Sequence, residues 1–185
     1  AGAQVVLPGK AEVYMTPAEF RQETGRQLPA YSEAPVLAER VAGGELPSVE
    51  QRLPAEPLVV DPLDEIGVYG GEIRGSATTP IFGADDLFQG RIQGVLGVSP
   101  DRERIVGNIA KGWEFSDDYR SFTVFLRDGM KWSDGEPFTA DDFVFWYEDY
   151  LRNTELMPRV PSTWRPGGEP MTVTKIDDNT VRFDF

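Results

Sequence analysis

Adjacent carboxylates are the chemically suggestive feature that recurs most often in this sequence. A hydrolase that works with two carboxylates holds them on opposite sides of its substrate, roughly 5–10 Å apart. Neighbouring acids on a turn or at a helix start do not supply that separation, and both places favour Asp for ordinary structural reasons. We therefore interpret the pairs first as helix caps and solvated turns, with metal ligation and catalysis as the alternatives. The Asp-Asp pairs are Asp85-Asp86, Asp117-Asp118, Asp141-Asp142 and Asp177-Asp178.

Histidine and cysteine are both absent from the 185 residues. Their absence excludes disulfides, thiol nucleophiles, Cys/His zinc sites and every triad that needs an imidazole. None of the lysines stands in a Ser-x-x-Lys pattern, and the glycines between Gly67 and Gly75 fit neither the phosphate-loop nor the dinucleotide-binding spacing. The sequence therefore predicts no catalytic residue, no metal site and no cofactor.

Four tryptophans could line a pocket for a carbohydrate or a peptide. For Trp113 and Trp146 we favour core packing, because both fall within regular apolar patterns. Trp132 and Trp164 lie in turn-rich contexts, so for these two residues packing and ligand contact both stay open.

The net charge limits the classes of partner that the chain can bind. The chain has 31 acids and 18 bases, which gives a formal charge of −13 at pH 7. Such a surface repels nucleic acid and anionic lipid, so we expect no nucleic-acid partner. No apolar run approaches the ~20 residues of a membrane-spanning helix, so we expect no direct membrane insertion. The 40% hydrophobic content is that of a globular domain.

Two short helices are predicted in the N-terminal part of the chain. Thr16-Pro17-Ala18-Glu19 is a capping box with proline at the first helical position, and Gly25 ends the helix that follows. A second helix is expected from Ala34 to Val41, closed by Gly43-Gly44. Eight of the 15 prolines fall within residues 1–65, which predicts an extended lead with no long helix.

The middle of the chain predicts shorter elements. Glu72 to Arg74 is expected to form a strand after a glycine-rich turn that contains Gly67, Gly70 and Gly71. Residues 84–96 carry apolar side chains at near-helical spacing and predict a helix. Residues 105–113 are expected to mix short strands with turns.

The last third predicts a strand, a helix and a hairpin. In the strand from Ser121 to Arg127, residues 122, 124 and 126 share one face. Thr139 is expected to cap a helix with two carboxylates in its first turn. Residues 171–176 and 180–185 flank a turn and form a hairpin. The apolar face expected for the helix consists of Phe143, Trp146 or Tyr147, Tyr150 and Leu151.

These last elements belong to a long stretch that resembles a known family. The stretch from Trp113 to Asp118 and from Phe122 to Phe145 is similar to the signature of the extracellular solute-binding proteins of family 5. These proteins are the dipeptide, oligopeptide and nickel receptors of ABC importers. Four upstream segments resemble a subgroup with a longer N-terminal lead: Leu37–Arg40, Gly44–Pro47, Arg52–Pro54 and Tyr69–Arg74.

The resemblance implies a fold class and a division of the chain. We expect an α/β, mixed α+β protein of the type II periplasmic-binding-protein kind, with the extra domain of the oligopeptide-receptor class. Residues 1–65 are expected to be a proline-rich lead that wraps the surface, 66–97 the start of the first lobe, and 98–185 an incomplete extra α+β domain. The family's members are much longer, so we expect an N-terminal portion that by itself binds solute weakly or not at all.

The resemblance also implies where ligand would be contacted. The loop after the first strand of the first lobe, residues 76–82, matches the family's loop at the mouth of the binding cleft. Within it we predict Thr78, Thr79, Pro80 and Phe82 as ligand-binding residues, because hydroxyls and an aromatic ring suit a peptide or a sugar. An ordinary polar connection is the alternative for this loop.

The function implied is that of a receptor that captures a peptide or an oligosaccharide in the periplasm and delivers it to the membrane subunits of an ABC permease. Ala1-Gly2-Ala3 has the small-x-small pattern that ends a secretory signal peptide, which favours export. Two alternatives stay open: a carboxylate-dependent, glycosidase-like hydrolase, and a stand-alone interaction module.

Overall fold

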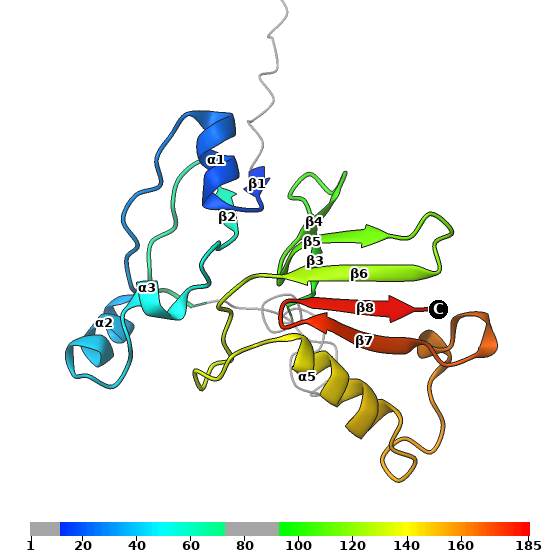
Figure 1. Cartoon of the computed structure of the whole chain (residues 1–185). Helices are drawn as coiled ribbons and strands as arrows, with labels where there is room; N and C mark the ends of the chain where they lie inside the picture. Colours follow the sequence, from blue (N-terminus) through cyan, green and yellow to red (C-terminus); the bar gives the residue numbers. More distant parts are fainter. Residues whose placement is uncertain (1–11, 73–92) are drawn as a thin grey trace, which may run out of the picture. The chain divides into compact units, whose positions relative to one another are not determined.

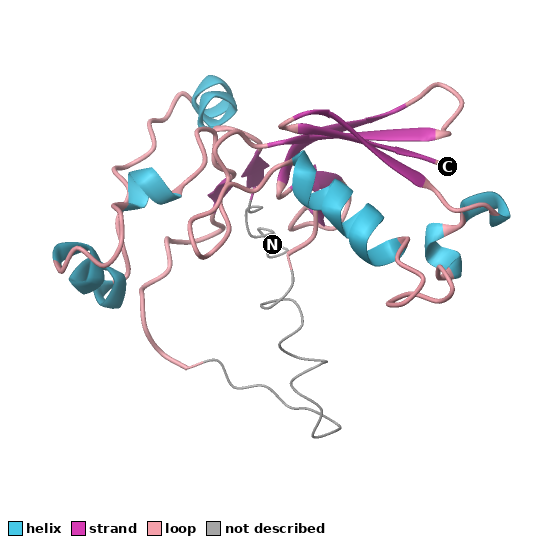
Figure 2. Ribbon diagram, turned by 60° about the horizontal axis from the view of Figure 1, so that its bottom comes forward, coloured by secondary structure: helices cyan, strands magenta, loops and turns pink. Residues whose placement is uncertain are grey.

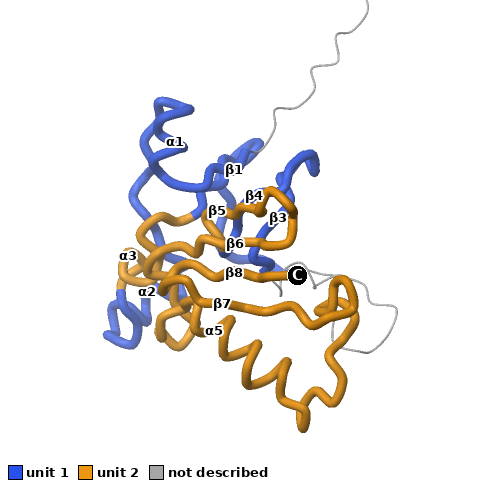
Figure 3. The backbone as a smooth tube through the Cα atoms, turned by 45° about the vertical axis from the view of Figure 1, so that its right-hand side comes forward, with its two compact units in different colours: residues 1–47, 58–109 blue, residues 48–57, 110–185 orange. Residues whose placement is uncertain are grey.

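The computed structural model describes residues 12–72 and 93–185. The chain divides into two compact units, shown in different colours in Figure 3. Unit 1 comprises residues 1–47 and 58–109, and unit 2 comprises residues 48–57 and 110–185. The sequence-based division into 1–65, 66–97 and 98–185 as three parts of a receptor stays a prediction.

The N-terminal helix of unit 1 forms as its capping residues predict. Helix α1 runs from Pro17 to Thr24, and the Thr16 hydroxyl accepts a hydrogen bond from the Glu19 N–H at 3.1 Å. Gly25 ends the helix at φ 68°, a left-handed conformation that glycine adopts at little cost. The ring of Phe20 is buried and meets Tyr14 edge-on, with 5.3 Å between the ring centroids.

Two small antiparallel ladders accompany α1 in unit 1 (Figure 1). Strand β1 (Glu12–Tyr14) pairs with β2 (Val59–Asp61), and β3 (Leu96–Val98) pairs with β4 (Ile105–Gly107). Helix α2 covers Pro35–Ala42 and ends at Gly43, which confirms the second predicted helix.

Part of one predicted helix is wrong. Residues 84–92 lie outside the described residues, but 93–95 are not helical and Leu96 opens strand β3. Gly94 permits the non-helical backbone before β3, because a Cβ there would lie 2.6 Å from the carbonyl oxygen of Leu96. Backbone pairing of Leu96 with Gly107 then overrides the near-helical spacing of the apolar residues.

Unit 2 is built on a four-stranded antiparallel sheet of order β5-β6-β8-β7. Its strands are β5 (Ala110–Phe115), β6 (Ser121–Leu126), β7 (Thr172–Asp177) and β8 (Thr180–Asp184). The predicted strand and the C-terminal hairpin are therefore confirmed. Val124 and Leu126 are buried on one face of β6, as the alternation requires.

One helical segment lies along this sheet (Figure 2). Helix α5 (Ala140–Phe145) continues directly into a π-helical turn, η1 (Trp146–Leu151). Its buried face contains Ala140, Tyr147 and Leu151. Tyr150 is 46% exposed, so its predicted place on the apolar face is wrong. The π turn shifts the phase of the last residues, which single-period reasoning does not anticipate.

Two short 3₁₀ helices follow, η2 (Ser162–Trp164) and η3 (Pro166–Gly168). A single helical turn, α3 (Val49–Arg52), belongs to the lead segment of unit 2. That segment is held to the sheet by Arg127, whose Nη1 donates to the Glu56 carbonyl at 2.7 Å. Across the described ranges, no helix has both the length and the apolar character needed to cross a membrane.

Candidate functional site

The ligand-contacting loop predicted from the sequence lies outside the described residues. This applies to all four residues named for it: Thr78, Thr79, Pro80 and Phe82. Their role therefore stays a prediction.

Within the described part of unit 1, an open groove of about 690 Å³ runs beside the β3–β4 ladder. Strands β3 and β4 supply most of its wall, and β1 and the residue before β2 supply one side chain each. The apolar side chains that line it are Val13, Leu58, Leu96, Val98, Ile105 and Val106. Val98 is 64% exposed and Ile105 is 61% exposed, so the groove presents aliphatic surface to solvent.

Two neutral amide side chains stand at the same groove. The Asn108 Nδ2 donates to the Gln93 Oε1 and to the Gly94 carbonyl, both at 3.0 Å. The backbone N–H of Asn108 also donates to the Val95 carbonyl at 3.3 Å. Asn108 thus fixes the backbone before β3 and places amide groups beside the aliphatic wall. Apolar walls with a few oriented polar groups are the usual lining of a small-molecule site.

The turn between β3 and β4 is held by a buried hydroxyl. Ser99 is 2% exposed; its Oγ donates to Asp101 Oδ1 at 2.5 Å and accepts the Arg104 N–H at 3.0 Å. The Arg104 guanidinium in turn pairs with Glu12 at 2.9 Å, which links the turn to β1. These contacts hold β1 and the β3–β4 ladder on the two sides of the groove.

Sequence reasoning missed this groove. Its lining comes from three separate segments between Val13 and Asn108, and none of them carries a recognisable motif. The apolar residues that alternate in β3 indicate a half-buried strand rather than a binding surface.

The carboxylate pairs in unit 2 serve structural roles, as their first interpretation predicts. Asp142 accepts the Thr139 N–H at 2.7 Å and the Trp132 Nε1–H at 3.0 Å. The Lys175 Nζ lies 2.7 Å from both Asp141 and Asp178. The hydrogen bonds from Lys175 to Asp141 and Asp178 raise the pKa of the lysine above its ordinary value.

Asp117-Asp118, the other Asp-Asp pair with a described side-chain contact, also has a structural role. The Ser116 hydroxyl donates to Asp118 at 2.7 Å and lowers the pKa of that carboxyl. Asp85-Asp86 lies outside the described residues. Within 12–72 and 93–185, the acids form no group of three or more that could hold a metal ion.

The two tryptophans whose role was open both make packing contacts. The ring of Trp132 meets Phe138 edge-on, with centroids 5.0 Å apart. Trp164 meets Trp146 in the same manner, also at 5.0 Å. Both keep exposed area, 50% for Trp132 and 36% for Trp164, so packing occupies only part of each ring.

Comparison with known proteins gives consistent results. A family model described as bacterial extracellular solute-binding proteins, family 5 Middle, matches residues 104–185. The periplasmic alpha-galactoside-binding protein of Rhizobium meliloti (strain 1021) is 34% identical over 86% of the chain. The periplasmic murein peptide-binding protein MppA of Escherichia coli K12 is 31% identical over 56% of the chain and is matched over 16% of its own length.

Two solved structures show the same relationship in three dimensions. An oligopeptide-binding protein OppA matches 94% of the chain with a TM-score of 0.80 and 36% identity. The periplasmic binding protein MelB of Agrobacterium fabrum C58, solved in complex with stachyose, matches 85% with a TM-score of 0.58 and 33% identity.

The chain spans only part of these proteins: 26% of the alpha-galactoside-binding protein and 27% of each of the two solved structures. The mixed α/β fold class of the oligopeptide-binding kind is confirmed by these neighbours. The family model, the relatives and the structural neighbours all agree with the signature between Trp113 and Phe145, and together they support a fragment of a bacterial extracellular solute-binding protein of family 5.

Proposed function

We propose that this chain is part of the substrate-binding receptor of an ABC importer. The receptor captures a peptide or an oligosaccharide in the periplasm and delivers it to the membrane subunits of a permease. The observation that carries the proposal is the match over most of the chain to a periplasmic alpha-galactoside-binding protein and to an oligopeptide-binding protein. Those names cover the two ligand classes that we propose.

Within the described residues, we assign the ligand-facing role to the groove of unit 1 and a scaffolding role to unit 2. Neutral amides beside aliphatic side chains suit a sugar or a peptide backbone, which present hydroxyls or amides together with apolar edges. The sheet, helix and caps of unit 2 hold their carboxylates in structural contacts. Binding without chemical conversion of the ligand is therefore the activity we propose.

The loop predicted from the sequence is proposed as a second source of ligand contacts. We propose that Thr78, Thr79, Pro80 and Phe82 contact ligand in the receptor. Replacing Thr78 and Thr79 together by Ala should lower the affinity for ligand, and unchanged affinity in the double variant would remove the loop from the site.

A thermal-shift screen of the receptor that contains this chain tests the function. Ligand that binds only the folded state stabilises it by about 2.7 kcal/mol at a concentration 100 times the dissociation constant. We expect an upward shift with members of a peptide panel or an oligosaccharide panel, and recovery of the same ligand unchanged by mass spectrometry. Hydrolysed ligand would favour the enzyme alternative, and no shift with either panel would contradict the proposal.

A matched pair of variants tests the groove separately. Val98→Asn places an amide on the aliphatic wall, whereas Val36→Asn makes the same change on α2, outside the lining. The two valines are 64% and 65% exposed, so the effects of the two changes on folding should be similar. We expect Val98→Asn to weaken ligand binding by about fivefold, from ~1 kcal/mol of lost apolar contact, and Val36→Asn to leave it unchanged. Equal affinities would assign the ligand contacts elsewhere.

A further inference from the structure

A second concavity lies in unit 2 and differs in chemistry from the groove of unit 1. It has a volume of about 380 Å³ and is formed by the segment between η1 and β7. Its lining carries two guanidinium groups and no carboxylate, although the chain as a whole has a charge of −13. The lining residues are Arg159, Val160, Pro161, Ser162, Arg165 and Gly168.

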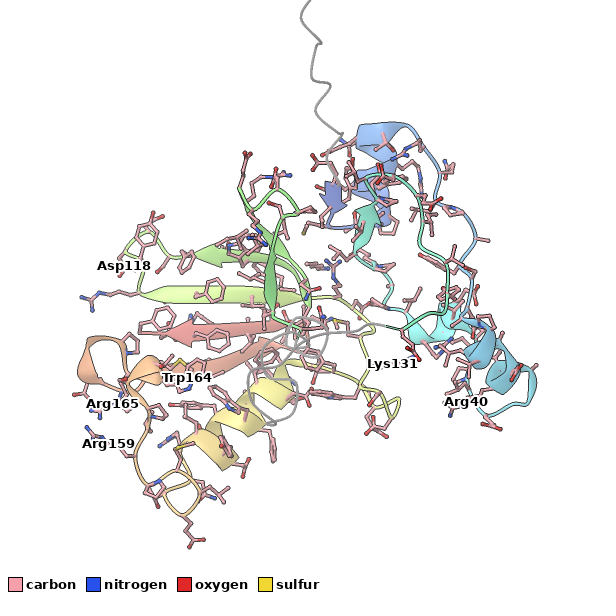
Figure 4. The ribbon with its side chains drawn as sticks, turned by 180° about the vertical axis from the view of Figure 1, so that it is seen from behind. Arg40, Asp118, Lys131, Arg159, Trp164 and Arg165 are labelled. Carbon is pink, nitrogen blue, oxygen red and sulfur yellow. The ribbon has the colours of Figure 1, made fainter. Side chains whose placement is uncertain are left out.

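The two arginines are prepared for binding in different ways. Arg165 donates from Nε at 3.0 Å and from Nη2 at 2.5 Å to the carbonyl of Gly168, which fixes the plane of its guanidinium. Three of its five N–H bonds then remain for another acceptor. Arg159 is exposed and forms no ion pair or side-chain hydrogen bond with any residue in the described ranges. Figure 4 shows both side chains on the same side of unit 2, beside Trp164.

The segment that carries these arginines is anchored to the core of unit 2. Trp164 packs edge-on against Trp146, and the Met171 N–H donates to the Trp164 carbonyl at 3.0 Å. Met171 itself is 2% exposed. Gly167 and Gly168, at φ 74° and 96°, make the turn that directs the Gly168 carbonyl toward Arg165. A segment fixed in this way loses little conformational freedom when a ligand binds.

We propose that this pocket, defined by Arg159, Ser162 and Arg165, binds the oxyanion group of a small acid, a carboxylate or a phosphate. A guanidinium presents a planar fork of N–H donors that matches the oxygens of either group. The Ser162 hydroxyl adds a neutral donor at the same concavity. The site lies in unit 2 and is independent of the solute-binding role proposed for the groove of unit 1.

Nuclear magnetic resonance on the whole 185-residue chain tests the pocket. Inorganic phosphate and citrate are titrated in separate arms, and the Nε–H signals of Arg159 and Arg165 are followed with the amides of Ser162 and Gly168. We expect saturable shifts of these signals with at least one anion. Saturation with phosphate alone identifies a phosphate site, and saturation with citrate alone identifies a carboxylate site.

Two substitutions separate the pocket from bulk charge. Arg159→Gln removes one guanidinium from the lining, and we expect about a tenfold loss of affinity for the anion that binds. Arg120→Gln removes the same charge from an exposed position at the β5–β6 turn and should leave the affinity unchanged. The proposal fails if neither anion gives saturating shifts, or if Arg120→Gln weakens binding as much as Arg159→Gln does.

Discussion

Arg127 provides a sharp test of how unit 2 is held together. Its side chain is 2% exposed, and it donates to the Glu56 carbonyl at 2.7 Å and to the Ala110 carbonyl at 3.4 Å. Burial lowers the pKa of the guanidinium, while the nearby Glu56 carboxylate opposes that shift. Arg127→Met keeps the apolar stem of the side chain but removes every donor, so the carbonyls lose these partners.

The magnitude follows from those contacts. A buried carbonyl that loses its partner costs about 1–3 kcal/mol, and the Glu56 contact, which has a fully charged donor but is only partly buried, falls within that range. The contact at 3.4 Å adds little. Relief from burying a charge offsets part of the loss. We therefore expect a net destabilisation of about 1–2 kcal/mol, which corresponds to a fall in Tm of roughly 2–8 °C for a chain of this length.

Urea unfolding of the Arg127→Met variant beside Arg120→Met measures the difference. Arg120 is exposed at the β5–β6 turn of the same unit, so its replacement removes the same charge without touching a buried carbonyl. Hydrogen exchange adds a local readout, because the Ala55 N–H donates to the Asp128 carbonyl at 3.0 Å beside Arg127 and should exchange faster in the variant. Free energies of unfolding within about 0.5 kcal/mol of each other would show that the Arg127 hydrogen bonds do not stabilise unit 2.

Three further changes probe the core, the helix cap and the charges of unit 2. Leu126→Ala, at a fully buried position, should lower the free energy of unfolding in urea by about 2–5 kcal/mol. Ile176→Ala, at a 53% exposed position, should lower it much less, and equal losses would contradict the assigned core. Thr139→Ala should cost about 0.5–2 kcal/mol because it removes the hydroxyl that accepts the Asp141 N–H, and an unchanged midpoint would contradict that role. Lys175→Met should be less stable than the wild type at neutral pH. Because the pKa of Lys175 is raised in the folded state, its contribution to stability is present below the unfolded-state pKa of about 10.4 and is lost as the pH rises through the folded-state pKa. A stability difference between Lys175→Met and the wild type that stays constant up to strongly alkaline pH would contradict the two ion pairs.

Local chemistry made much of the fold predictable. The helix that begins after Thr16 ends at Gly25 because the side-chain cap and the left-handed glycine act within a few residues of each other. Thr139 and Asp142 form a reciprocal cap for the same reason. The alternation in β6 placed Val124 and Leu126 in the core, since a strand that is buried on one face leaves no other arrangement for its apolar side chains.

The features that could not be predicted depend on contacts between distant segments. The groove of unit 1 requires Val13 to meet residues of β3 and β4, and no local pattern encodes that meeting. Leu96 fits a helical spacing but pairs with Gly107 instead, because the ladder partner lies outside any short window. Tyr150 is exposed because the helix changes to π geometry at Trp146, and the sequence gives no signal of that change.

Calorimetry can compare solute binding by two proteins, the receptor that contains this chain and the 185-residue chain alone. Both are titrated with the same peptides and oligosaccharides. A solute held between two lobes is bound tightly only when both lobes contact it. We expect saturable, reversible binding of an unaltered ligand by the receptor, and weak or undetectable binding by the 185-residue chain. Tight binding of the same ligand by the 185-residue chain, or conversion of the ligand by either protein, would show that this chain is not one part of a two-lobed receptor.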